Sequence, residues 1–196
     1  MRLPLLLLAS LSLAACVGNV RQADIANFDL GTAAIAWKPA EVRLRSVEVN
    51  APSWLATSAI QYRLLYADAM RRQSYAESRW AAQPAELMAR ALDRQTAAAP
   101  GGCRLRLDID ELVQVFDAPT AARVLLDVRA GLVAPQGDAV LARKAFSVAQ
   151  PAPSADARGG VAATGSALQA LAGDLGAWLS QAAHENPAIA ERCKGN

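Results

Sequence analysis

The sequence predicts an α+β domain in which a single, mostly antiparallel sheet has two main helices packed on one face. Two observations lead to this prediction. Apolar residues alternate with charged ones over three successive segments, residues 105–115, 124–132 and 139–149, which is the period of half-buried strands. Two further segments, beginning at Pro84 and near Leu168, repeat apolar residues at helical spacing instead.

Residues 41–49 form the first expected strand. Its apolar side chains change face midway, with Val42 and Leu44 on one side and Val47 and Val49 on the other. This change of face predicts a bulge or burial on both sides of the strand.

A second strand and the first helix follow. Residues 60–66 alternate apolar or aromatic side chains with Gln61 and Arg63, which predicts the strand. Pro84 then begins the helix, because a missing N–H costs nothing at the first helical position. The Pro-Gly-Gly sequence at residues 100–102 ends it.

The next three strands lie close together in the sequence. The joins at residues 117–119 and 135–138 are short enough for hairpins, so these strands are expected to form an antiparallel meander. The first of them is expected to turn five apolar residues to one face: Leu105, Leu107, Ile109, Val113 and Val115.

A loop rich in Pro, Gly and Ala over residues 151–160 precedes the final helix. One continuous apolar stripe runs along that helix: Leu168, Leu171, Leu175, Trp178, Leu179 and Ala182. Such a stripe needs an apolar surface to cover, and the sheet provides one. A lipid held between the helix and the sheet is the alternative use of the stripe.

The first residues have the parts of a secretory signal: a positive residue, an apolar run and small residues before a cut. The run, residues 3–13, is shorter than the roughly 20 residues that span a bilayer. Cys16 directly follows the small residues, which resembles the lipobox of bacterial lipoproteins, where this cysteine is acylated; an incidental cysteine is the alternative. We expect a signal peptide over residues 1–15, a lipid-anchored tether over 16–27 and a single periplasmic domain over 28–196.

The charges of the chain nearly balance, with 20 Lys and Arg against 18 Asp and Glu. This balance supplies no field that would recruit nucleic acid, so no nucleic-acid partner is expected. A catalytic site also lacks its parts, because His184 is the only histidine and the sequence has neither a nucleophile elbow nor a P-loop. We expect no enzyme activity, and no cofactor apart from covalent lipid on Cys16.

Asp108, Asp110 and Glu111 lie close together in the sequence, as calcium ligands do. They lack the turn glycine and the later glutamate of an EF-hand loop, and alternation puts the two aspartates on the wet face of a strand. We expect a solvated strand face here and no metal site.

Two cysteines remain after Cys16, at Cys103 and Cys193. An exported chain enters an oxidising compartment, where such a pair usually forms a disulfide. The bridge would fasten the C-terminal tail to the sheet, and two free thiols are the alternative. A zinc site is not expected, because the chain offers only one histidine to complete it.

Aromatic and arginine side chains gather between residues 37 and 80. Both types are enriched at protein interfaces, so this region is a candidate docking surface, with core packing as the alternative for its aromatic rings. The partner-binding candidates are Trp54, Leu55, Arg63, Tyr75, Arg79 and Trp80.

The order of several short segments carries a family resemblance. Residues 51–57 (APSWLAT), 60–66 (IQYRLLY), 75–80 (YAESRW) and 84–87 (PAEL), preceded by 28–31 (FDLG), resemble the ABC-type transport auxiliary lipoprotein family. The resemblance spans essentially the chain after the signal.

The resemblance implies an accessory docking subunit without enzymatic activity. Its system would consist of an ATPase, a permease and a periplasmic MCE-domain protein, which is the expected partner, and would move lipid across the envelope. Val17, in place of the aspartate that retains lipoproteins at the inner membrane, indicates the periplasmic face of the outer membrane. The sequence leaves homo-oligomer formation open.

A second function remains open, an outer-membrane lipoprotein that regulates cell-wall synthesis or envelope assembly. Such regulators carry long tethers that reach the wall. The segment 17–27 reaches some 40 Å at about 3.3 Å per extended residue, which favours a partner that comes to the membrane.

Overall fold

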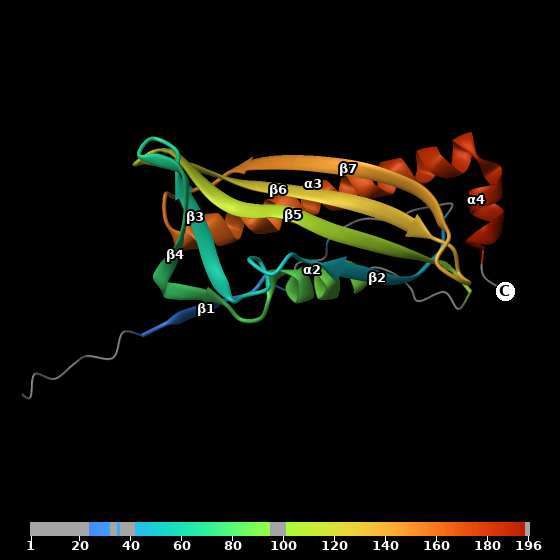
Figure 1. Ribbon diagram of the computed structural model, residues 1–196, viewed down its shortest axis with the longest axis horizontal. Helices are drawn as coiled ribbons and strands as arrows, with labels where there is room; N and C mark the ends of the chain where they lie inside the picture. The colour runs from blue at the N-terminus through green and yellow to red at the C-terminus, as the bar shows by residue number, and fades with distance from the viewer. Residues whose placement is uncertain (1–23, 32–34, 36–41, 95–100, 195–196) are drawn as a thin grey trace, which may run out of the picture.

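The computed structural model describes residues 24–31, 35, 42–94 and 101–194 (Figure 1). The predicted signal peptide, the acylated Cys16 and most of the predicted tether lie outside these residues. Strand β1 includes Ala26 and Asn27, the last two residues assigned to the tether.

A seven-stranded sheet and three helices make up the described part of the chain. The elements are β1 (Ala26–Phe28), β2 (Leu44–Asn50), β3 (Ala59–Leu64), β4 (Asp68–Trp80), α2 (Pro84–Asp93), β5 (Cys103–Ala118), β6 (Ala121–Val133), β7 (Val140–Pro151), α3 (Ala157–Glu185) and α4 (Pro187–Arg192). The strand order is β1-β4-β3-β5-β6-β7, with β2 also paired to β5.

Parallel and antiparallel pairs share this sheet, so the prediction of a mostly antiparallel sheet is wrong. The pairs β3–β4, β5–β6 and β6–β7 are antiparallel, whereas β1–β4, β2–β5 and β3–β5 are parallel. Both β2 and β3 lie along the same edge of β5, against residues 103–108 and 114–116. The chain returns to the start of β5 through β4 and α2, and such a crossover makes neighbouring strands parallel.

The antiparallel meander of β5, β6 and β7 is confirmed, with register running along nearly the whole length of each strand. The bulge expected in the first predicted strand is also confirmed, because the β2–β5 register shifts between Leu44 and Ser46.

Strand β4 was not predicted from the sequence. Of its side chains only Trp80, the last, is buried, so no apolar face marks a period of two. It pairs with β3 on one side and, through residues 78–80, with β1 on the other.

A one-residue bulge at Asp110 divides β5 into two parts. Ile109 pairs with Val128, and Glu111 already pairs with Asp127, so Asp110 has no residue opposite to it. A bulge of this kind reverses which side chains point to each face of the strand.

The reversal corrects the predicted single apolar face of β5. Leu112 belongs to the core on the inner face, the face of the sheet against which α3 packs. Val113 and Val115 therefore turn to the opposite, outer face, where they are nevertheless buried. The predicted pattern holds for residues 105–109 and is wrong beyond the bulge.

Helix α3 begins at Ala157, inside the segment 151–160 that was expected to be a loop. Asp156 is its N-cap: the carboxylate accepts the Gly159 N–H at 2.7 Å and the Ser154 hydroxyl at 2.8 Å. The bond from Gly159 satisfies a backbone N–H that has no partner within the first turn of the helix. This cap lets α3 begin at Ala157, although Gly159 and Gly160 favoured a loop there.

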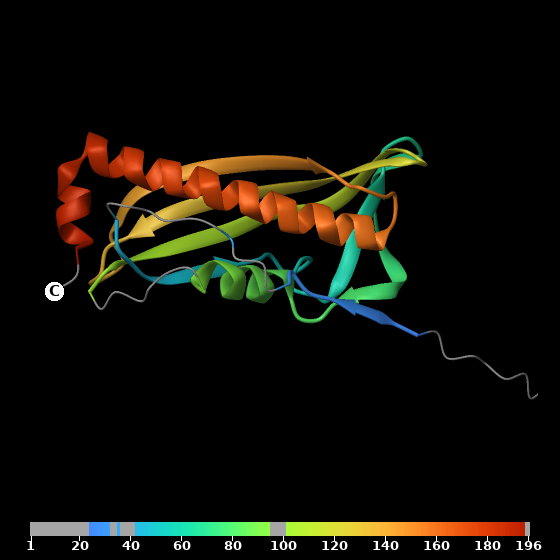
Figure 2. The ribbon, with the colours of Figure 1, turned by 180° about the vertical axis from the view of Figure 1, so that it is seen from behind.

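The stripe predicted on the final helix packs against the meander. Leu168, Leu171, Leu175 and Leu179 are at most 1% exposed, and α3 runs across β6 and β7 (Figure 2). Burying each leucine is worth about 1.5–3 kcal/mol, so this contact is a main source of stability. Helix α2 contacts β2, and the short α4, which was not predicted, packs on α3.

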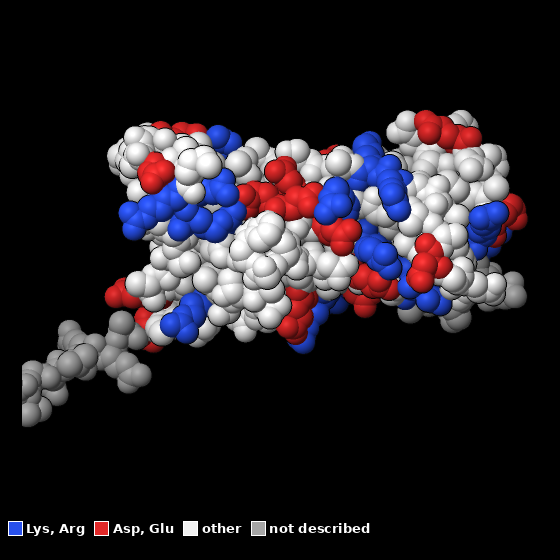
Figure 3. Space-filling view, viewed as in Figure 1, with Lys and Arg blue, Asp and Glu red and all other residues white. Residues whose placement is uncertain are grey.

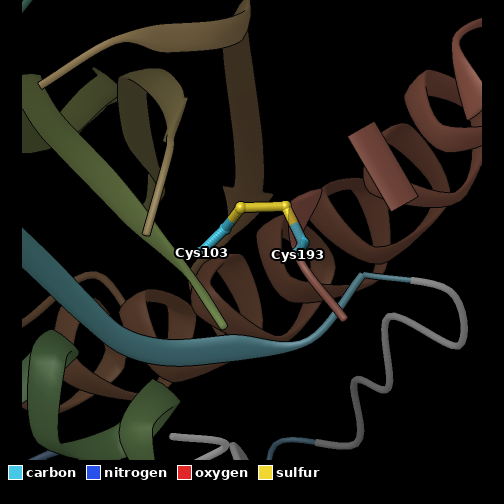
Figure 4. The surroundings of a disulfide bond; sticks show 2 residues. All are labelled: Cys103 and Cys193. Carbon is cyan, nitrogen blue, oxygen red and sulfur yellow. A yellow bond between two sulfur atoms is a disulfide. The ribbon is translucent and has the colours of Figure 1, made fainter. Parts of the chain in front are cut away.

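Cys103 and Cys193 form a disulfide in the structure (Figure 4). Cys103 begins β5 and Cys193 directly follows α4, and both are fully buried. The bridge closes a loop with a sequence separation of 90 residues and ties the last helix to the first residue of the central strand.

Removing this bridge should destabilise the domain. A double variant, Cys103→Ala with Cys193→Ala, should lower the free energy of unfolding by up to about 4–5 kcal/mol, because the unfolded chain regains the freedom of the open loop. Urea denaturation of the oxidised protein and the variant measures the change. A variant as stable as the parent would show that the bridge constrains little.

The N-cap of α3 should give a pH-dependent contribution. Hydrogen bonds from the Gly159 amide and the Ser154 hydroxyl lower the pKa of Asp156, so its stabilisation is present above the ordinary carboxyl pKa and is lost as pH falls through the folded value. Asp156→Ala should cost about 1 kcal/mol at pH 7. Denaturation at pH 7, 5 and 3 should show that the difference in unfolding free energy between the parent and Asp156→Ala becomes smaller as the pH falls. Asp156→Asn keeps a capping side chain without a titratable group, so its own unfolding free energy should not show the pH dependence that Asp156 gives the parent.

Candidate docking surface

Half-buried charges gather on the outer face where β3, β4 and β5 meet. Glu111 accepts from Arg72 Nη2 at 2.6 and 2.7 Å and from Arg63 Nη2 at 3.0 Å. Arg72 Nη1 also donates to Gln61 Oε1 at 2.7 Å. The bulge at Asp110 makes this cluster possible, because it turns Glu111 outward beside the two arginines. Arg63, a predicted docking residue, is thus engaged within the fold.

Tyr75, another predicted docking residue, takes part in a second network near the start of α3. Its hydroxyl donates to Gln114 Oε1 at 2.9 Å, and Gln114 Nε2 donates to the Asp156 carbonyl at 3.0 Å. The Tyr62 ring lies 4.7 Å from the Tyr75 ring, and burial raises the pKa of Tyr75. Gly160 leaves room for this network, since a Cβ there would lie 2.3 Å from Gln114 Oε1.

The remaining predicted docking residues divide between core and surface. Trp80 is 5% exposed and Leu55 3%, so both are core residues. Arg79 is exposed on β4. Trp54 is 54% exposed, a large fraction for an indole.

Trp54 stands beside a surface groove lined by Asn50, Asp108, Asp110 and Arg129. Arg129 donates to both carboxylate oxygens of Asp110 at 2.7 and 2.8 Å, and these bonds lower the pKa of Asp110. Asn50 Nδ2 donates to Asp108 Oδ1 at 3.1 Å. The acidic residues considered as calcium ligands are thus bonded to separate groups, and the described residues contain no cluster of three metal-ligating side chains.

Trp54 is held by a short, bonded turn. Leu55 N–H donates to the Pro52 carbonyl at 2.9 Å, and Gln61 Nε2 donates to the Trp54 carbonyl at 2.8 Å. The buried Leu55 side chain fixes the turn to the core. An exposed aromatic ring on a fixed backbone loses little freedom on binding, which suits it to anchor a partner.

Two exposed apolar side chains in and after the β3–β4 turn are not among the predicted docking residues. Tyr66 is 50% exposed and Met70 91%. Alternation over residues 60–66 placed Tyr66 within a strand, but β3 ends at Leu64. Neither residue has a sequence pattern that separates it from the core aromatics.

Comparison with known protein families gives one match. A family described as the ABC-type transport auxiliary lipoprotein component matches residues 31–176. The chain belongs to this family. Membership confirms the resemblance found in the sequence and makes the protein an auxiliary lipoprotein component associated with ABC-type transport in the cell envelope.

Two solved structures share the fold of this family member. The crystal structure of protein XCC0632 from Xanthomonas campestris, of family DUF330, has a TM-score of 0.65 at 17% identity and covers 84% of this chain and 97% of that one. A crystal structure of an uncharacterised protein has a TM-score of 0.63 at 12% identity, over 80% and 99% of the two chains. No functionally curated protein matches the sequence.

The size of one internal cavity bears on whether lipid could lie between the sheet and α3. A cavity of about 20 Å³ lies between β3 and the start of α3, which holds roughly one water and no acyl chain. In the part of the chain that the structure describes, no helix has the length and apolar character to cross a membrane.

The Glu111 cluster should act in stability and not in docking. Glu111→Gln leaves Arg63 and Arg72 without their carboxylate, and we expect a loss of about 1–2 kcal/mol, less than for a fully buried pair because all three side chains keep some solvent contact. Urea denaturation measures the loss. Glu86→Gln, which breaks the exposed pair with Arg90, is the matched control and should change stability by less than about 0.5 kcal/mol.

Proposed function

We propose that this auxiliary lipoprotein is a docking subunit, without enzymatic activity, for the periplasmic MCE-domain protein of a lipid transport system. The family match over residues 31–176 carries the proposal, since it covers every element from β2 to most of α3. The proposal places the domain at the periplasmic face of the outer membrane, anchored through lipid on Cys16, while ATPase and permease act elsewhere in the same system.

The structure supports Trp54 as the anchor of the docking surface. Trp54 combines exposure with a fixed backbone, and the neighbouring groove is lined by polar and charged side chains, among them Arg129, Asp108 and Asn50. Aromatic anchors surrounded by polar groups are the usual energetic centres of protein interfaces. Trp80 is unsuitable for testing docking, because its substitution would damage the core.

The test is recovery of the partner from cell envelopes. The full-length protein is crosslinked in place, purified through its anchor and analysed by mass spectrometry. We expect an MCE-domain protein with the parent chain and at least a tenfold smaller yield with Trp54→Ala, since an interface hot spot contributes about 2 kcal/mol or more. Met70→Ala, the truncation of a still more exposed apolar side chain at the β3–β4 hairpin, should leave the yield unchanged.

Other recoveries would contradict the proposal. Cell-wall synthases or assembly proteins without an MCE-domain protein would favour the regulatory function instead. An MCE-domain protein recovered equally with Trp54→Ala, in a variant of normal thermal stability, would place the docking surface away from Trp54.

A further inference from the structure

A hollow lies on the outer face of the meander, around Gly131 of β6. In the register of the sheet, Gly131 pairs with Arg106 of β5 on one side and with Arg143 of β7 on the other. Paired residues share a face, so two arginines flank a position that has no side chain. The hollow above Gly131 has a volume of about 500 Å³ and includes both arginines in its lining.

The backbone does not require glycine at position 131. Positive φ angles occur at other described glycines but not at Gly131. A Cβ there would meet only Val140 Cγ1, at an ordinary contact distance of 3.9 Å. Glycine inside a strand is destabilising, and it often marks a place where a ligand approaches the backbone closely. The lack of a side chain therefore keeps the hollow open.

The charged residues that line the hollow are Arg106, Arg129, Arg143 and Lys144 with one carboxylate, Asp108, so its positive charges are only partly neutralised. Arg143 is exposed and has no ion-pair partner among the described residues. Arg106 approaches Glu48 at 3.9 Å, beyond hydrogen-bonding distance. Arg129 is bonded to Asp110 and so is occupied. On the face seen in Figure 3, basic side chains lie over this part of the sheet with acidic side chains among them.

We propose that the hollow binds the phosphate group of an anionic phospholipid, held between Arg106 and Arg143. Two strand spacings put their backbones about 10 Å apart, so both long side chains can close on one phosphate from opposite sides. Guanidinium groups match phosphate oxygens in pairs of hydrogen bonds. Val140, a 37% exposed apolar residue at the rim, offers a surface to the glycerol and the first acyl carbons. The choice of a lipid as the phosphate carrier rests on the proposed function.

The test is binding of a short-chain phospholipid to the mature, acylated chain in a non-ionic detergent. Dihexanoyl phosphatidic acid is titrated by calorimetry, with dihexanoyl phosphatidylcholine and glycerol phosphate in parallel. We expect the phosphatidic acid to bind best, and Arg143→Gln to weaken its binding about tenfold or more through loss of a charged pair of hydrogen bonds. Gly131→Val, which puts a branched side chain on the floor of the hollow between the two arginines without changing charge, should do the same at unchanged or higher thermal stability.

A matched control separates the site from general charge. Arg90→Gln removes an exposed arginine on α2, and should leave binding unchanged. An equal loss with Arg90→Gln, or full binding by Gly131→Val, would overturn the site. Glycerol phosphate bound as tightly as the phosphatidic acid would overturn its assignment to lipid. Because this titration contains no partner protein, its failure beside normal MCE recovery would refute this site alone.

Discussion

The one-residue bulge at Asp110 in β5 decides how the two faces of the domain are built. Before it, β5 pairs with β2 and turns Leu105, Leu107 and Ile109 to the helices. After it, β5 pairs with β3 and its phase is reversed. The reversal sends Glu111 outward to its arginines and Gln114 inward to Tyr75. Both polar networks that join the β3–β4 hairpin to the meander therefore depend on Asp110, the one residue of the bulge that has no residue opposite to it in β6.

The sequence predicted the meander and the final helix well because each is a long element with one dry face. Register and bulge were harder to see. Residues 112–116 read Leu-Val-Gln-Val-Phe, so both faces of this part of the strand carry apolar side chains. The alternation pattern therefore cannot tell which face points to the core. Strand β4 was not predicted for the opposite reason: nearly all its side chains contact solvent, so apolar and polar residues do not alternate along it. Parallel pairing depends on which edge a returning chain meets, a long-range property that local pattern does not contain.

The candidate docking residues show the same limit at the level of single side chains. Trp54 and Trp80 are of one residue type in one arginine-rich region, yet one is exposed and the other lies in the core. Sequence composition located the region, while only the packing of Leu55 and the turn around it distinguishes the exposed Trp54 from a core residue. The family resemblance came from the order of short segments, which reflects the whole chain path and not any one contact, and the family match over residues 31–176 confirmed it.

The disulfide has a mechanical consequence if the chain is held at its N-terminal side, as we propose. Tension that passes along the chain to Cys103 continues to Cys193 through the covalent bridge, so it does not stretch the backbone of residues 104–192. The meander and α3 are thus shielded from stretching along the chain. A pull from a docked partner at Trp54 would be carried by the short parallel pairings of β1 and β2, and these would yield before the central sheet.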